Sequence, residues 1–410
     1  MRGDLPSGWV RTTLGELVKT KSGNSKLIKG RLAATPESGL VPAYSASGQD
    51  VWCDEAEWRE SGVVLSAVGA RCGKTFLALG SWTAIANTHV LIPHDGIDPK
   101  WLWYLTNDEN LWIKGGSAQP FVKMKASKQI PVLLPPTKDQ KRIVTAIEEH
   151  FSRLDAVEAT TVDARRRLDV LRNAIMDLAF YDDANSKFTA EIGDLAEVSG
   201  GIQKQPKRRP RENRYPFLRV ANVGRGHLDL GDVHEIELFE GEIDRFRLSK
   251  GDLLVVEGNG SVNQIGRAAL WGGQIENCVH QNHLIRVRPG ESLLPEYLTL
   301  CWNAPRTAQQ IQAVASSTSG LYTLSTSKVK SIRIPVAPLS VQRSVVEQLD
   351  QQLCSIEMAH AAAKDASSRV LALRRAVLAD AFSGQLVPQN PKDEPATALL
   401  DRIAATRQPA

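Results

Sequence analysis

Residues 135–146 read PPTKDQKRIVTA, and residues 337–348 read APLSVQRSVVEQ. The two stretches align without a gap, 202 residues apart, with Pro136 opposite Pro338. Because the alignment continues well beyond these stretches, the chain contains one unit twice. The same offset aligns Gln140 with Gln342, Val144 with Val346, Asp163 with Asp365, Arg167 with Arg369, Leu171 with Leu373 and Phe180 with Phe382.

The repeated part carries the pattern of a coiled coil. Apolar residues recur every seven positions and alternate with a second row three residues further on, which is typical of helices that pair along one seam. His150, Thr161, Gln352 and Asp380 interrupt the pattern. In the first copy the seam consists of Ile147, Leu154, Leu168 and Ile175, alternating with Val157, Ala164, Leu171 and Leu178. In the second copy it consists of Leu349, Ile356, Ala363, Val370 and Val377, alternating with Ala359, Ala366 and Leu373.

Each repeat predicts one long helix. Each starts just after a proline and has no interior Pro or Gly over about 43 residues, or about 64 Å. One helix leads out of the first domain and the other out of the second, so pairing their seams requires an antiparallel coiled coil. The alternative is that two ordinary surface helices pack on separate cores.

The remaining sequence predicts two α+β domains. Short β-rich runs such as residues 62–68 and 251–256 alternate with Gly, Asn and Pro turns, and each region has one short helical patch. The expected architecture is therefore α+β, with two α/β domains separated by two long helices and an internal pseudo-two-fold repeat. The predicted boundaries are 1–135 and 184–337 for the domains, 136–183 and 338–383 for the helical spacers, and 384–410 for a tail that returns towards the N-terminus.

Composition excludes several classes of protein. With 410 residues, 42% hydrophobic and 23% charged, the chain is typical of a globular protein. No apolar run reaches the ~18 residues of a membrane span, and the start lacks a signal-peptide segment, so we expect a cytoplasmic protein without membrane contact. Five cysteines without a C-x-x-C pair indicate reduced thiols and no metal site. A net charge of +4 is too small to indicate nucleic-acid binding by itself.

One motif resembles a nucleotide-binding loop. Residues 69–75 read GARCGKT, one residue shorter than a P-loop, and the following residues continue as a strand where a P-loop would open a helix. We therefore expect a hairpin turn whose Arg71 and Lys74 can reach a phosphate backbone, with nucleotide hydrolysis as the weaker alternative. The counterpart at residues 257–267 offers Asn259, Asn263, Gln264 and Arg267, which are side chains of the kind that read base edges. A plain surface turn is the alternative for both.

No catalytic constellation is evident. His89 and His283 are predicted to occupy matching places, but neither has a carboxylate or cysteine at ligand spacing, so we expect structural histidines. The sequence also lacks the Asn/Asp-Pro-Pro-aromatic motif of amino-methyltransferases and a restriction-type nuclease centre. The chain by itself is therefore not expected to be an enzyme.

The strongest charge cluster lies early in the second domain and has one acid, Glu212. Such a cluster is either a solvated surface or an arm that contacts phosphates. The first domain has a looser series of Lys19, Lys21, Lys26, Lys29 and Arg31. The cluster itself contains Lys204, Lys207, Arg208, Arg209, Arg211 and Arg214.

These features together resemble the DNA specificity subunit of type I restriction-modification enzymes over nearly the full length. The resemblance rests on residues 5–9 (LPSGW), both helix starts, residues 250–255 (KGDLLV), and the tail segments 382–388 (FSGQLVP) and 393–396 (DEPA). The second helix start departs from the family at Ala337, where a second proline is usual, and at Val341, where Glu is usual.

The resemblance implies that the chain is a non-catalytic subunit with two target recognition domains that read a bipartite, asymmetric sequence in double-stranded DNA. It also implies binding of modification (adenine methyltransferase) subunits, two of them, and of ATP-dependent restriction subunits. No cofactor is expected in this chain, and S-adenosylmethionine, ATP and Mg are expected in the partners. The alternative is a DNA-binding regulator or scaffold that serves no restriction system.

Overall fold

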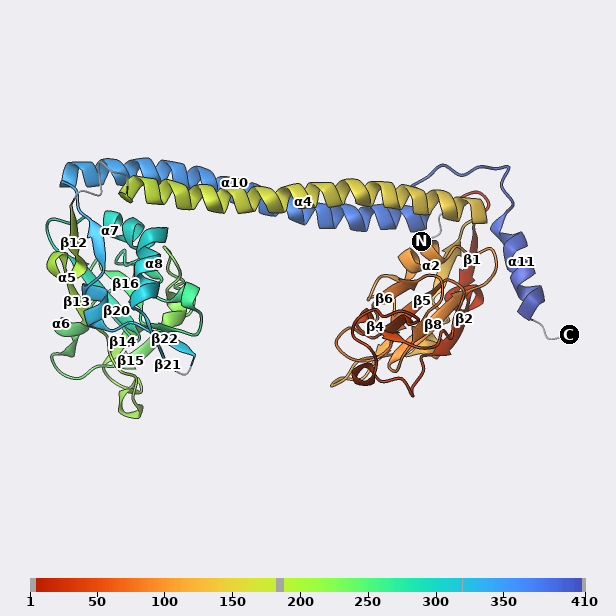
Figure 1. Ribbon diagram of the computed structural model, residues 1–410, viewed down its shortest axis with the longest axis horizontal. Helices are drawn as coiled ribbons and strands as arrows, with labels where there is room; N and C mark the ends of the chain where they lie inside the picture. The colour runs from red at the N-terminus through yellow and green to blue at the C-terminus, as the bar shows by residue number, and fades with distance from the viewer. Residues whose placement is uncertain (1–4, 182–187, 319, 408–410) are drawn as a thin grey trace. The chain divides into compact units, whose positions relative to one another are not determined.

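The computed structural model describes residues 5–181, 188–318 and 320–407. The chain forms two compact units (Figure 1), one made of residues 1–160 and 366–410 and the other of residues 161–365. Both long helices pass from one unit into the other. They are α4 (Thr137–Tyr181) and α10 (Leu339–Ser383), each of 45 residues, close to the predicted length. In the described part no helix is long and apolar enough to cross a membrane.

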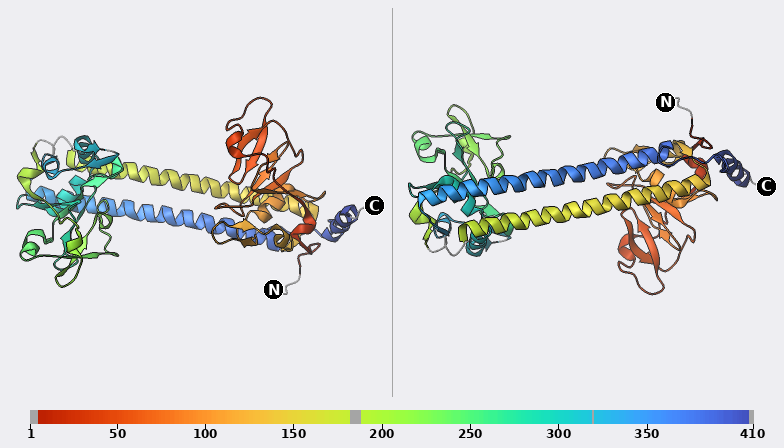
Figure 2. Two further views of the ribbon diagram at one scale, coloured as in Figure 1. Left: turned by 90° about the horizontal axis from the view of Figure 1, so that it is seen from below. Right: turned by 90° about the horizontal axis from the view of Figure 1, so that it is seen from above.

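Within each unit the two helices pack antiparallel, as predicted (Figure 2). In the first unit, the start of α4 shares a core with the end of α10, and Arg374 forms ion pairs with Asp155 and Glu158. In the second unit, the end of α4 shares a core with the start of α10, and His360 Nε2 lies 3.3 Å from Asp169.

The seam of the helix pair differs from the prediction in its second row. The seven-residue row is buried at Ile147, Leu349, Ile356 and Val370, and half-buried at Leu154, Leu168, Ile175 and Val377. The row three residues further on is wrongly predicted at four positions, because Val157, Leu171, Leu178 and Leu373 are 48%, 48%, 66% and 52% exposed, whereas its alanines Ala164, Ala359 and Ala366 are half-buried.

The second inward-facing row lies four residues after the first. It includes Phe151, Leu353 and Ala381, which pack on the domain cores. A step of four residues turns a helix by about 40° and a step of three by about 60° the other way. The face of each long helix that packs on the domains therefore carries the residues four positions after the seven-residue row. Leu171 and Leu373 lie three positions after that row and face away from the domains.

The two domains share one sheet topology. Each has a four-stranded antiparallel sheet, in the order β2-β8-β5-β6 or β13-β20-β16-β18, covered by a short helix. Apolar runs make these strands, and β5 and β16 are buried along their whole length. The first domain uses β2 (Val18–Ser22), β5 (Gly62–Ser66), β6 (Thr75–Ala78), β8 (Thr88–Pro93) and α2 (Pro99–Thr106). The second uses β13 (Ala196–Gly200), β16 (Leu253–Val256), β18 (Ala268–Leu270), β20 (Leu284–Pro289) and α7 (Pro295–Trp302).

A second sheet in each domain has one antiparallel and one parallel pairing, in the order β4-β3-β7 or β15-β14-β19. The first consists of β3 (Val41–Ser45), β4 (Gly48–Cys53) and β7 (Thr83–Ala84). The second consists of β14 (Arg214–Leu218), β15 (His234–Glu237) and β19 (Val279–His280).

A two-stranded ribbon connects each domain to its helix. β1 (Val10–Thr13) pairs with β11 (Pro131–Leu134), and β12 (Thr189–Glu191) pairs with β23 (Arg333–Pro335). A one-turn helix follows the first strand of each ribbon, α1 (Leu14–Leu17) or α5 (Ile192–Leu195), so the two copies match here too.

The other elements are small. In the first domain they are η1 (Lys29–Arg31), β9 (Lys114–Gly115), β10 (Phe121–Val122) and α3 (Met124–Ser127). In the second they are η2 (Pro206–Arg208), η3 (Val220–Asn222), α6 (Glu242–Phe246), β17 (Gly258–Asn259), η4 (Val262–Gln264), α8 (Pro305–Val314), β21 (Ser316–Thr318), β22 (Leu321–Thr323) and α9 (Thr326–Lys330).

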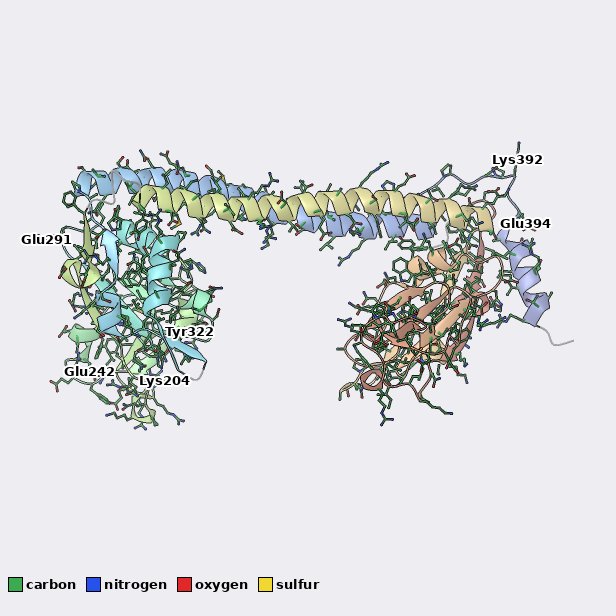
Figure 3. The ribbon with its side chains drawn as sticks, viewed as in Figure 1. Lys204, Glu242, Glu291, Tyr322, Lys392 and Glu394 are labelled. Carbon is green, nitrogen blue, oxygen red and sulfur yellow. The ribbon has the colours of Figure 1, made fainter. Side chains whose placement is uncertain are left out.

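The tail ends in α11 (Ala396–Arg407), which packs on the first unit. The Ala396 N–H donates to the Gly8 carbonyl at 2.9 Å, and Asp393 pairs with Arg142 of α4 at 2.5 Å. Glu394, labelled in Figure 3, forms a two-point ion pair with Arg402 at 2.6 and 2.8 Å. The tail therefore closes the first unit against both the turn that precedes β1 and the helix α4.

Candidate nucleic-acid interface

The basic loop, residues 204–214, joins β13 to β14 in the second unit. Figure 3 labels Lys204 in this loop and Glu242, which lies in the same part of the unit. The side chains of Lys204, Lys207, Arg209, Arg211 and Arg214 are exposed, and within the described residues none forms an ion pair of 4 Å or less. The loop thus presents five positive charges to solvent.

Arg208 differs from its neighbours in the basic loop. Its guanidinium donates to both carboxylate oxygens of Glu242 at 2.7 Å and lies 4.7 Å from the centre of the Phe239 ring. This two-point pairing raises the pKa of Arg208 and lowers that of Glu242. The guanidinium is already paired with Glu242, so its interpretation as a phosphate contact stays a prediction. Arg208 fixes the loop to α6.

Glu237 at the end of β15 holds the other half of the basic loop. Its carboxylate accepts from the backbone N–H groups of Arg211 at 2.6 Å, Asn213 at 2.9 Å and Glu212 at 3.3 Å. These hydrogen bonds lower the pKa of Glu237. The roles of Glu237 and Glu242 were not predicted from the sequence, although the acids of residues 235–244 are a signal of charge complementary to the loop.

The second candidate loop, residues 257–267, joins β16 to β18. Asn263 and Gln264 are exposed, and the Asn259 Oδ1 accepts from the Ser261 N–H at 2.8 Å. Arg267 does not face solvent freely, because it donates to the Val223 carbonyl at 2.7 Å and the Val220 carbonyl at 3.2 Å. Burial also lowers its pKa. This arginine therefore supports the neighbouring loop, and its interpretation as a base-reading side chain stays a prediction.

In the first unit, residues 69–75 form the predicted hairpin turn. β6 pairs antiparallel with β5, and Gly69 and Gly73 have φ angles of 95° and 99° that favour glycine. Because a strand follows the motif, the P-loop alternative is wrong. Arg71 donates to the Ser47 carbonyl at 3.0 Å, and Lys74 Nζ lies 3.6 Å from Glu109, with both side chains exposed.

The looser basic series of the first unit is partly neutralised. Lys29 pairs with Asp50 at 2.5 Å, and Lys21 lies 3.9 Å from Glu57 and 5.3 Å from the centre of the Trp58 ring. Fewer of its charges are thus open to solvent than in the basic loop of the second unit.

The predicted match between His89 and His283 is wrong. Val18 pairs with Pro93 in the first sheet and Ala196 with Pro289 in the second, so His89 corresponds to Ile285. The two domains differ by several residues in length, so matching them by residue identity alone placed the histidines two positions out of register. His283 is exposed, and its Nδ1 lies 2.9 Å from Glu257. Burial lowers the pKa of His89.

Two buried glutamines have a role that sequence matching alone did not reveal. Gln140 accepts from the Asp98 N–H at 2.7 Å and donates to the Pro135 carbonyl at 3.1 Å. Gln342 accepts from the Leu294 N–H at 2.8 Å and donates to the carbonyls of Ser292 and Ala337 at 2.9 and 2.8 Å. Each glutamine joins the first turn of a long helix to the start of α2 or α7.

Within the described residues, no three His, Cys, Asp or Glu side chains gather as a metal site would require.

Comparison with known proteins identifies the family of the chain. The model for the type I restriction modification DNA specificity domain matches residues 6–162 and again residues 186–361. The chain belongs to the type I DNA specificity family.

Several proteins resemble this family member over long stretches. The specificity subunit of the type I restriction enzyme EcoKI from Escherichia coli K12 is 26% identical over 70% of this chain and 66% of its own length. That of EcoDI from Escherichia coli is 21% identical over 99% of this chain and 96% of its own length. Thus the chain spans about two thirds of the first relative and nearly all of the second.

Solved structures share the fold. A chain from a study of complex assembly and conformational transition of the type I R-M system matches 93% of this chain and 100% of itself, with a TM-score of 0.73 and 18% identity. The HsdS subunit from Thermoanaerobacter tengcongensis matches 94% of this chain and 99% of itself, with a TM-score of 0.54 and 19% identity.

Proposed function

We propose that the chain gives a type I restriction-modification complex its DNA sequence specificity by binding a bipartite, asymmetric target. The single observation that carries this proposal is the duplication, because two domains with one sheet topology differ in the loops that they expose. One domain would read each half of the target. Because the two domains share a sheet topology but expose different loops, the two halves of the DNA target would differ in sequence.

The DNA contacts divide by chemistry. The exposed lysines and arginines of the basic loop, with Arg71 and Lys74 of the first unit, suit phosphate oxygens. The side chains of Asn259, Asn263 and Gln264 carry both donors and acceptors, which suits base edges. Arg208 and Arg267 hold these loops in place through their protein partners, and their contact with DNA stays a prediction.

The long helices offer docking surfaces for partner subunits. The exposed apolar side chains Val157, Leu171, Leu178 and Leu373 face away from the domains, where a partner can bury them. We assign this surface to two modification subunits that methylate adenine at N6, with restriction subunits joining the complex. S-adenosylmethionine, ATP and Mg would bind in those partners, and the complex would act in the cytoplasm.

Reconstitution tests this proposal. The purified chain should neither methylate nor cleave DNA, whereas mixing it with its modification subunit and S-adenosylmethionine should give methylation at one sequence only. Replacing Leu171 and Leu373 by Asp should weaken that assembly without changing DNA binding by the chain, and Ala362→Asp on an exposed position of α10 serves as the control. Methylation by the chain alone, or sequence-independent methylation by the mixture, would refute the proposal.

A further inference from the structure

A hollow of about 310 Å³ lies in the second unit between α4, the loop after η3 and α8. Two guanidinium groups, Arg172 and Arg225, line it together with amide side chains, and no carboxylate does. Guanidinium groups only donate hydrogen bonds and carry a positive charge, which is the chemistry that recognises an anion. Its lining residues are Arg172, Asn173, Arg225, Asn303, Pro305, Ala308, Gln309 and Gln312.

Arg225 is the central cation of this hollow. It is only partly exposed, and its Nη2 donates to the Asn263 carbonyl at 3.1 Å. Within the described residues neither Arg225 nor Arg172 has a carboxylate within 4 Å. Burial lowers the pKa of Arg225, and the charges of Arg172 and Arg267 lower it further, while the group stays charged. Partly buried cations without a counter-charge are unfavourable, so an anion bound here would stabilise the cluster.

A neighbouring hollow sets the direction of approach. It shares Arg172, Arg225 and Asn303 but adds Asp350 and Glu357 from α10. These two carboxylates would repel an anion that enters from the α10 side. The amide groups of Gln309 and Gln312 lie on α8, so the anion would enter along α8.

We propose that this hollow binds one phosphodiester group of the DNA backbone, an inference that rests on the proposed function of the chain. The site is continuous with the loop of residues 257–267, because Arg225 is hydrogen-bonded to Asn263 and lies beside Arg267. A strand whose bases are read by Asn263 and Gln264 would therefore pass Arg225. The phosphate held there would fix the position of the strand while the amides read its bases.

Salt-dependent DNA binding tests the proposal on the full chain with a duplex that contains its target. Arg225→Gln should weaken binding about tenfold and reduce the slope of log K against log salt by about 0.9, the value for one phosphate. Arg172→Gln should act in the same direction, and it keeps the test valid if the first variant fails to fold. Arg225→Lys should restore the slope. The control is Arg306→Gln on α8, an exposed cation that stacks on Tyr181 and does not line the hollow, and it should change neither quantity.

A series of duplexes, each with one neutral methylphosphonate, identifies the phosphate. At one position neutralisation should weaken the wild-type chain about tenfold and leave Arg225→Gln unaffected. If the methylphosphonate and the Arg225→Gln substitution weaken binding independently at every position of the duplex, the proposal is overturned. It is also overturned if the Arg225→Gln variant binds DNA normally but fails to bind the modification subunit, because the hollow would then bind an acidic protein segment. A wild-type chain without any preferred sequence would refute the proposed function as well, which distinguishes the two failures.

Discussion

Gln342 is a residue at which a long helix is fastened to its own domain, and its amide satisfies three backbone groups. Gln342→Leu removes these hydrogen bonds in a buried place, so we expect the free energy of unfolding to fall by about 2–4 kcal/mol. Denaturant unfolding measures this loss. Gln348→Leu, at an exposed position six residues further along α10, should change stability by less than about 0.5 kcal/mol. Equal effects of the two substitutions would contradict the role assigned to Gln342.

Glu242 gives the basic loop a dependence on pH. Its pKa is lowered in the folded chain by Arg208, so its contribution to stability is present above the unfolded pKa and is lost as the pH falls through the folded one. The loop should therefore loosen in acid below about pH 4.3, the ordinary pKa of Glu. Limited proteolysis at residues 204–214 should show this loosening, and Glu242→Gln should show it already at neutral pH. If cleavage of the variant matches that of the wild type at neutral pH, the pair does not hold the loop.

Among the elements, the basic loop gives the most direct test of DNA binding. Replacing Lys207, Arg209 and Arg211 by Ala, with Arg208 retained, should weaken binding to all sequences and reduce the salt slope by about 0.9 for each phosphate that the loop no longer binds. The control replaces Arg153, Arg165 and Arg166, which are exposed on α4, and should leave the salt slope unchanged. An unchanged slope in the loop variant, with weaker binding to only some targets, would mean that the loop reads bases.

The sequence predicted the elements better than their contacts. Local periodicity and turn chemistry can be recognised from the residue types and their spacing, and they predict the long helices and the hairpin at residues 69–75. The duplication can be recognised by aligning the sequence with itself. The exposed side of Leu171 and Leu373 depends on where a domain packs, and the pairing of Arg208 with Glu242 joins residues 34 positions apart. The match of His89 with His283 failed because loops of unequal length separate the paired strands. No local pattern carries such information.

At the scale of the whole molecule, α4 and α10 both continue from one unit into the other, so their length should set the spacing of the half-sites. Inserting seven residues after Ala164, and seven after its counterpart Ala366, preserves the seven-residue row and moves the units by about 10 Å. This shift equals about three base pairs and about 100° of DNA rotation. The original target should no longer be recognised, and any new target should keep its half-sites with a longer gap. Methylation mapping would measure this, and altered half-sites at constant spacing would refute the spacer role.

The tail that closes on Gly8 has a consequence for synthesis on the ribosome. The second unit is one continuous stretch, residues 161–365, whereas the first needs residues 366–410 to complete its core. The first unit begins to be translated first but completes its folding last. Its core around Leu134 and Ile147 remains incomplete until residues 366–410 have been synthesised, after the whole second unit. A stop codon near the end of the gene would leave the second unit intact and the first one open to proteases. Truncated products should thus accumulate as fragments that retain the distal domain.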